Sequence, residues 1–408
     1  MKPSCLGCGD RLPEAFLDLG SLPLANSLVL PRDAARPDAC YPLAVAHCAS
    51  CQLVQLRERV PPEAMFSDYL YFSSFSSSFV EHARRMAGDL GQRFSLGPGS
   101  RVLEVASNDG YLLEHFQRAG FAVLGVEPAA NVADQARARG IPTLVRFFGP
   151  DAVDEVRAQL GPADLLVGNN VLAHVPEING FLTAARECLG PGGVAVFEFP
   201  SLAELLARTE FDTIYHEHVF YLSLLAVDGL ARRAGLEVFD VERLAVHGGS
   251  LRVFLSRPGR EVSPRVAAGL EGERAAGLHR PDRYEGFADG VRRLQHGLVE
   301  GLRSRRRAGA RIAAYGAPAK GNTLLNSSGI GPELVEFTVD RNPHKQGRLL
   351  PGSRIPVRPV EDLLAEQPDF AVLLPWNLEA EVAAQESDYL RRGGCFLVPV
   401  PELREVRL

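Results

Sequence analysis

Four cysteines near the start of the chain have the type and spacing of a metal site. They form two C-x-x-C pairs, Cys5-Leu-Gly-Cys8 and Cys48-Ala-Ser-Cys51, and each pair can present two thiolates to one tetrahedral Zn²⁺ from a tight turn. Cys40 and His47 are close enough in the sequence to compete as ligands. Because four protein ligands leave no open coordination position, we expect a zinc ion that holds the fold and takes no part in chemistry.

A second group of residues could move protons. Tyr215-His-Glu-His218 places a phenol, two imidazoles and a carboxylate on consecutive positions, after the run that we expect to be the fifth strand of a parallel sheet. Imidazole titrates near neutral pH and suits general acid–base catalysis. A histidine pair beside a glutamate can equally form a metal site or a hydrogen-bonded structural corner. His174 is a weaker candidate that gains from its position just beyond the fourth strand.

Polar residues at the ends of predicted strands indicate a cofactor site. The first strand-to-helix turn exposes backbone amides to a ligand and offers Glu104, Asn108, Asp109 and Gly110. Glu127 ends the next strand, where two carboxylate oxygens can accept the two hydroxyls of an adenosine ribose. Asn169 and Asn170 end the fourth strand and would face the methionine half of S-adenosylmethionine. The turn lacks the close-packed glycines that the pyrophosphate of NAD requires, so we favour S-adenosylmethionine.

An alternation of short apolar runs and helical segments must position these residues. Strand-like runs at 101–106, 121–126, 164–167 and 194–199 are typical of a doubly wound parallel sheet. After an insertion at 200–221, two more runs follow at 237–241 and 251–255. A polar, arginine-rich stretch at 258–309 reads as a connector, and the α/β alternation restarts at 311–322 and 335–340. We therefore predict an α/β protein with domains at 1–66 (zinc-binding), 67–258 (methyltransferase) and 259–408 (connector helices and a Rossmann-like domain).

Composition excludes several classes of protein. With 408 residues, 46% hydrophobic and 23% charged, the chain should fold into two or three compact domains. A net charge of -6 without a long basic run argues against nucleic acid as a partner. We find no apolar stretch of membrane-spanning length and no signal region, so we expect a cytoplasmic protein. Five of the seven cysteines lie within the first 51 residues, which favours metal over disulfides.

Together these motifs resemble the sugar C-methyltransferases of deoxysugar biosynthesis over nearly the whole chain. The resemblance rests on the two cysteine pairs and on four segments, Leu103–Gly110, Asn169–His174, Tyr215–His218 and Tyr315–Asn322. It implies a zinc-binding domain, a class I methyltransferase domain whose last two strands form an antiparallel hairpin, and a C-terminal Rossmann-like domain. It also implies that a nucleotide-linked keto-sugar, with thymidine diphosphate as the nucleotide, binds between the second and third domains.

The resemblance implies active-site roles for Tyr69, His174, Tyr215, Glu217 and His218. A C–H bond next to a ketone is acidic because the enolate places charge on oxygen, so the site needs a base and a donor to that oxygen. We expect His218 to be the base with Glu217 orienting it, and Tyr215, with His174 or Tyr69, to stabilise the oxygen.

The loop with Gly316, Lys320 and Asn322 looks suited to the nucleotide or its phosphates, and we expect a monomer. The alternatives are an O- or N-methyltransferase of a sugar or natural product, and a nucleotide-binding scaffold without catalysis.

Overall fold

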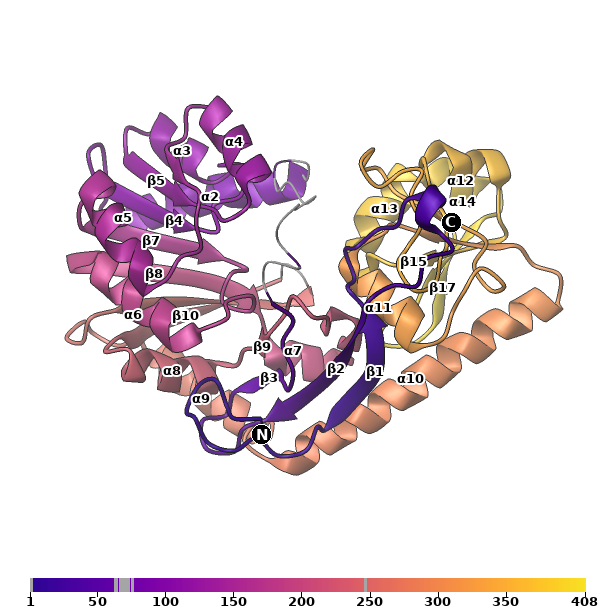
Figure 1. Cartoon of the computed structure of the whole chain (residues 1–408), viewed down its shortest axis with the longest axis horizontal. Helices are drawn as coiled ribbons and strands as arrows, with labels where there is room; N and C mark the ends of the chain where they lie inside the picture. Colours follow the sequence, from indigo (N-terminus) through magenta and orange to yellow (C-terminus); the bar gives the residue numbers. More distant parts are fainter. Residues whose placement is uncertain (1–2, 62–64, 66–73, 75–76, 246–247) are drawn as a thin grey trace.

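The computed structural model describes residues 3–61, 65, 74, 77–245 and 248–408, and within these ranges the chain forms three β-sheets (Figure 1). The largest has seven strands in the order β10-β11-β8-β7-β4-β5-β6. These are β4 (Arg101–Val105), β5 (Ala122–Val126), β6 (Thr143–Leu144), β7 (Ala163–Asn169), β8 (Leu189–Pro200), β10 (Glu237–Leu244) and β11 (Ser250–Ser256). Strands β4 to β8 run parallel, whereas β10 and β11 form the antiparallel hairpin that the family resemblance implied.

Helices cover both faces of this sheet because its strands are apolar on both sides. On β4, Val102 packs with α2 and α3, whereas Leu103 and Val105 pack with α5, α6 and α8. The helices are α2 (Ser77–Arg93), α3 (Leu113–Arg118), α4 (Ala130–Ala138), α5 (Val153–Leu160), α6 (Ile178–Cys188) and α8 (Leu224–Arg233), with the 3₁₀ turn η3 (Pro150–Ala152). The predicted doubly wound sheet is confirmed.

The C-terminal part contains a second α/β sheet, in the order β14-β13-β12-β15-β16-β17. Its strands are β12 (Ile312–Tyr315), β13 (Thr338–Val339), β14 (Val357–Arg358), β15 (Phe370–Leu373), β16 (Cys395–Val398) and β17 (Arg404–Val406). Its helices are α11 (Ala319–Ser327), α12 (Glu361–Glu366), η6 (Trp376–Leu378), α13 (Glu379–Gln385) and α14 (Ser387–Arg391). Of the run at 335–339 predicted to be a strand, only Thr338 and Val339 (β13) pair with neighbouring strands, β12 and β14.

The N-terminal sheet includes one strand from the middle of the chain. Its order is β1 (Leu17–Pro23), β2 (Cys40–His47), β3 (Val54–Leu56) and β9 (Phe220–Tyr221). Strand β9 belongs to the insertion after β8, which also forms α7 (Leu202–Arg208) and η4 (Phe211–Thr213). Val54 pairs with Tyr221 and Gln55 with Phe220. The insertion is therefore anchored to the zinc-binding part of the chain.

The N-terminal sheet, the insertion after β8 and the C-terminal sheet share one apolar core. The predicted connector forms α9 (Pro264–Ala275) and α10 (Pro281–Arg307), and Figure 1 shows α10 and the β1–β2 pair running from the N-terminal end to the C-terminal sheet. Leu17 and Leu22 of β1 belong to the same core as Phe287 of α10 and Ile312 of β12. Between β1 and β2 lies η1 (Pro31–Asp33). The predicted domain boundaries at 66 and 258 stay predictions.

Among the helices of the described ranges, none combines the length and the apolar character needed to cross a bilayer.

Candidate active site

The four predicted zinc ligands lie together. Their sulfur atoms are all within 4.8 Å of one another, with 3.4 Å between Cys5 and Cys51 and 3.5 Å between Cys8 and Cys48. Each pair lies in a turn closed on the carbonyl of its first cysteine, by the N–H of Gly9 or of Gln52. Four sulfurs bound to zinc at about 2.3 Å would be about 3.8 Å apart, so this donor set fits one tetrahedral ion.

The two competing ligands named from the sequence have other surroundings. Cys40 is exposed, and its thiol donates to the backbone oxygen of Asp38. His47 stacks on Tyr284 with 4.3 Å between ring centroids and contacts the side chain of Gln52. The structure therefore favours the four cysteines alone.

Glu127, the predicted ribose ligand, holds the backbone around the first turn with both carboxylate oxygens. Its Oε2 accepts from the N–H of Asn108 at 3.0 Å, and its Oε1 accepts from the N–H of Ala129 at 2.9 Å. Burial raises the pKa of Glu127, and these two hydrogen bonds oppose the rise. Each oxygen keeps a lone pair for a hydroxyl, so the carboxylate can hold the first turn and a ligand at the same time.

The first turn brings the other predicted cofactor residues to the same edge. Asn108 and Gly110 have positive φ, +49° and +79°. Asp109 is completely buried, and its nearest charged partner in the described ranges is Arg139 at 3.5 Å. Glu104 is also buried, and its pKa is raised by burial and by the charges of Glu127 and Asp109. Among the described residues, Oε2 of Glu104 and both carboxyl oxygens of Asp109 lack a hydrogen-bond partner, which fits a site completed by a polar ligand.

Asn169 ends β7 and Asn170 follows it, beside this turn. The Nδ2 of Asn169 lies 3.4 Å from the sulfur of Met86 on α2, and its Oδ1 lacks a hydrogen-bond partner among the described residues. Asn170 has a φ of +52° and donates its N–H to the carbonyl of Glu198 on β8. The predicted cofactor residues thus share one edge of the sheet, as the parallel topology requires.

The Tyr215–His218 turn contains a chain of two hydrogen bonds. His218 Nδ1 lies 2.8 Å from the carbonyl oxygen of Thr213, and His218 Nε2 lies 2.8 Å from the hydroxyl of Tyr215. A carbonyl only accepts, so Nδ1 carries the proton and neutral Nε2 accepts from Tyr215. Burial, and secondarily the charge of His174, lowers the pKa of His218 well below its ordinary value. The imidazole is therefore neutral at pH 7 and retains a basic nitrogen.

His174 is brought against this turn. Its ring is perpendicular to that of His218, with 4.7 Å between centroids. Burial lowers the pKa of His174 to about 4, while a hydrogen bond with the backbone of Glu217 opposes that change. Tyr69, the remaining predicted residue of the group, lies outside the described residues.

The two middle residues of the turn face the N-terminal part of the chain. His216 Nε2 lies 3.0 Å from the carbonyl oxygen of Tyr41 on β2, and Glu217 Oε1 accepts from Asn26 Nδ2 at 2.6 Å. The prediction that Glu217 orients His218 needs correction, since Thr213 supplies that hydrogen bond. Neighbouring residues in a tight turn project in different directions, so adjacency in the sequence did not bring the two side chains together.

The predicted nucleotide residues lie at the interface with the insertion. Lys320 contacts Asn377 Oδ1 and lies 3.9 Å above the ring of Trp376. Burial lowers the pKa of Lys320 to about 8, and the charges of Asp212 and Glu210 oppose that change. The role of Lys320 toward the nucleotide or its phosphates stays a prediction.

The other two nucleotide candidates also have packing roles. Asn322 donates to the backbone oxygen of Ala25 at 2.7 Å. Gly316 has a φ of +84°, and a Cβ there would lie 2.7 Å from the ring of Pro375. Any side chain at position 316 would separate the ends of β12 and β15.

Sequence reasoning missed a buried ion pair beside the cofactor edge. Glu198 lies opposite Asn169 in the β7–β8 register and contacts His82 Nε2 of α2 at 2.9 Å and Arg252 of β11. In the sequence, the only indication of this ion pair is Glu198, the single carboxylate in the apolar run 194–199.

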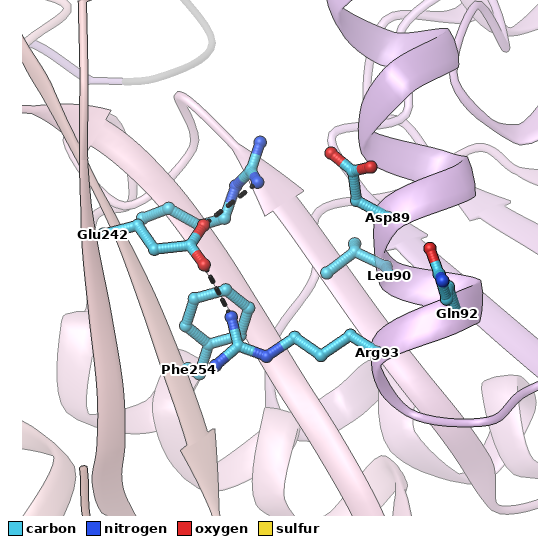
Figure 2. Close-up of a pocket in the computed structure, with 7 residues that line it drawn as sticks. Asp89, Leu90, Gln92, Arg93, Glu242 and Phe254 are labelled. Carbon is cyan, nitrogen blue, oxygen red and sulfur yellow. Dashed lines mark hydrogen bonds and ion pairs between the residues drawn. The ribbon is translucent and has the colours of Figure 1, made fainter.

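A polar pocket lies farther along α2, lined by Asp89, Leu90, Gln92, Arg93, Glu242, Arg252 and Phe254 (Figure 2). Figure 2 shows Glu242 between two guanidinium groups, of which Arg93 is at 2.7 Å. Arg93 also lies 3.9 Å above Phe254. These arginines are paired within the protein, so we assign the pocket a structural role and not a catalytic one.

Comparison with known proteins gives a consistent result along the chain. Family models match as a zinc binding domain at residues 5–66, a methyltransferase domain at 79–241 and a C-methyltransferase C-terminal domain at 245–401. The C-methyltransferase NovU of Streptomyces niveus is 38% identical over 404 residues, covering 98% of this chain and 96% of NovU.

More distant relatives match only part of the chain. The ubiquinone biosynthesis O-methyltransferase of Paramagnetospirillum magneticum is 32% identical over 140 residues, which are 33% of this chain and 54% of that enzyme. Among solved structures, the magnesium protoporphyrin IX methyltransferase of Synechocystis PCC 6803 with bound SAH aligns with a TM-score of 0.35 and 11% identity, over 44% of this chain and 83% of that one.

Proposed function

Because the chain belongs to the C-methyltransferase family that includes NovU, and is an S-adenosylmethionine-dependent enzyme with a zinc-binding domain, we propose that it methylates a carbon of a nucleotide-linked keto-sugar. The acceptor carbon is the one next to the ketone of a 4-keto-deoxyhexose, with thymidine diphosphate as the nucleotide. S-adenosylmethionine supplies an electrophilic methyl group when bound. Zinc has a structural role, since four thiolates leave it no open position.

The observation that carries this proposal is the hydrogen-bond chain from Tyr215 through His218 to Thr213. A carbon acid needs a neutral base that is shielded from water, and the backbone carbonyl of Thr213 fixes His218 in the tautomer whose Nε2 is basic. The same carbonyl would stabilise the imidazolium once Nε2 has taken the proton.

Tyr215 supplies the hydrogen-bond donor that the enolate oxygen needs. In the structure its hydroxyl donates to His218 Nε2. When the ketone oxygen of the sugar enters, the hydroxyl can turn from Nε2 to that oxygen, which frees the base and stabilises the enolate in one movement. His174 and Tyr69 are further donors in the proposal. These residues would hold the enolate carbon in line with the methyl group that bound S-adenosylmethionine would supply, with S-adenosylhomocysteine as the leaving group.

The cofactor residues hold the second reactant. Glu127 accepts the ribose hydroxyls, while Glu104, Asn108, Asp109 and Gly110 shape the turn beneath it. Asn169 and Asn170 face the methionine half. Gly316, Lys320 and Asn322 stay proposed neighbours of the nucleotide or its phosphates.

Product analysis tests the proposal directly. The enzyme is incubated with methyl-labelled S-adenosylmethionine and a thymidine diphosphate 4-keto-6-deoxyhexose, and the product is examined by NMR. The expected product has the label on a carbon of the sugar ring. A methyl ether or N-methyl product would replace the proposal with the alternative acceptor, and no transfer to any keto-sugar nucleotide would refute the substrate class.

A further inference from the structure

The loop between β1 and β2 reaches the proposed base region from the zinc-binding part of the chain. Its residue Asn26 donates from Nδ2 to Oε1 of Glu217 at 2.6 Å, although 191 positions separate them. Glu217 immediately precedes His218, and its backbone hydrogen-bonds His174. A side chain that holds Glu217 therefore acts on the segment that carries both histidines.

The loop is itself held in place. The N–H of Ser27 donates to the carbonyl of Leu24 at 3.1 Å, and the N–H of Leu28 donates to that of Asn26 at 2.9 Å, which closes a local turn. On the other side Asn322 of α11 holds the carbonyl of Ala25 at 2.7 Å. The amide of Asn26 is thus presented from a fixed backbone, supported by the C-terminal domain.

The two residues of this contact, Asn26 and Glu217, differ in their exposure to solvent. Glu217 is 5% exposed, whereas Asn26 is an exposed residue. A buried carboxylate requires hydrogen-bond donors to remain charged. Burial raises the pKa of Glu217 to about 7, and the hydrogen bond from Asn26 opposes that rise. Within the described ranges, Asn26 is the side chain that hydrogen-bonds this carboxylate, so its loss should affect both the position and the charge of Glu217.

We propose that Asn26 is a positioning residue of the methyl-transfer site, which holds the carboxylate of Glu217 and thereby the turn that carries His218. The inference rests on the proposed function, because it needs this turn to carry the base. In this proposal, the segment between the two cysteine pairs contributes to the reaction through Asn26 and not through the metal. Asn26 itself touches no reacting atom.

Two variants of Asn26 remove the donor in different ways. Asn26→Ala deletes the amide, and Asn26→Asp keeps its shape but places a carboxylate against Glu217. Ser27→Ala is the matched control, since Ser27 is an exposed neighbour in the same loop. We expect kcat to fall on the order of 10-fold in both Asn26 variants, with zinc content and the KM for S-adenosylmethionine unchanged. A kcat equal to that of Ser27→Ala would overturn the proposal.

A double variant shows whether the effect passes through Glu217. In the Glu217→Gln background, Asn26→Ala should cause little further loss of kcat, because the contact it removes has already been altered. Full additivity of the two losses would show that Asn26 acts elsewhere, and would also overturn the proposal.

A measurement without substrate separates this inference from the proposed function. The titration of Glu217 is followed by ¹³C NMR and assigned by the signal lost in Glu217→Gln. Its midpoint should rise by about one pH unit in Asn26→Ala, and further in Asn26→Asp. An unchanged midpoint refutes the contact. A shifted midpoint in an enzyme that methylates no keto-sugar would retain the contact and refute the proposed function.

Discussion

Replacement of Glu127 by Gln tests the cofactor site most directly. The carboxylate accepts hydrogen bonds from the N–H groups of Asn108 and Ala129, one on each oxygen. A glutamine has one oxygen and one NH₂ group, so one backbone N–H must face another donor. Two consequences follow, one in the free protein and one in binding.

The free protein should lose stability. A buried donor left without an acceptor costs about 1–3 kcal/mol, and this is the expected decrease in the free energy of unfolding without ligand. Binding should suffer separately, because a ribose hydroxyl loses a charged acceptor worth about 1.5–3 kcal/mol. That energy corresponds to a roughly 10- to 150-fold higher Kd for S-adenosylmethionine.

Urea unfolding without ligand measures the first effect, and titration calorimetry with S-adenosylmethionine measures the second. Glu285→Gln, at an exposed position on α10, is the control for loss of one negative charge. A Kd within twofold of the wild type would refute the ribose assignment. Reduced stability with an unchanged Kd would show that Glu127 only holds the turn.

The remaining predictions concern the metal, the base and the buried acid. Replacing both Cys5 and Cys48 by Ser should remove the single zinc per chain, measured by metal analysis, and lower stability; retained zinc would contradict the ligand set. His218→Asn should abolish exchange of solvent deuterium into the sugar while both substrates still bind in calorimetry, and persistent exchange would assign the base elsewhere. Tyr215→Phe should lower kcat by a factor of up to roughly 10² to 10³. An unchanged kcat would show that Tyr215 does not stabilise the enolate oxygen. Since burial raises the pKa of Glu217 to about 7 from 4.5, its contribution to the free energy of unfolding is complete below pH 4.5 and is lost as pH rises through 7. The wild type minus Glu217→Gln difference in urea unfolding should show this fall, and a flat difference would contradict it.

The sequence alone determined which elements form and which residues share an edge. The two cysteine pairs are local, because each turn closes within five residues, from Cys5 to Gly9 and from Cys48 to Gln52. Glu127 and Asn169 could be placed together because the ends of parallel strands meet at one edge of a sheet. The hairpin of β10 and β11 followed from the family resemblance and not from periodicity.

Only the tertiary structure decided which partner each polar side chain contacts. Packing of α11 against η4 exposes Lys320 to the charge of Asp212, which the sequence of its own loop does not indicate. Thr213 orients His218 through a backbone carbonyl, which every residue has and no residue pattern distinguishes. Pairing of β9 with β3 brings the insertion to the zinc-binding sheet, and Asn26 meets Glu217 across 191 positions. Such contacts depend on how separate elements pack, and the periodicity of each element by itself does not contain that information.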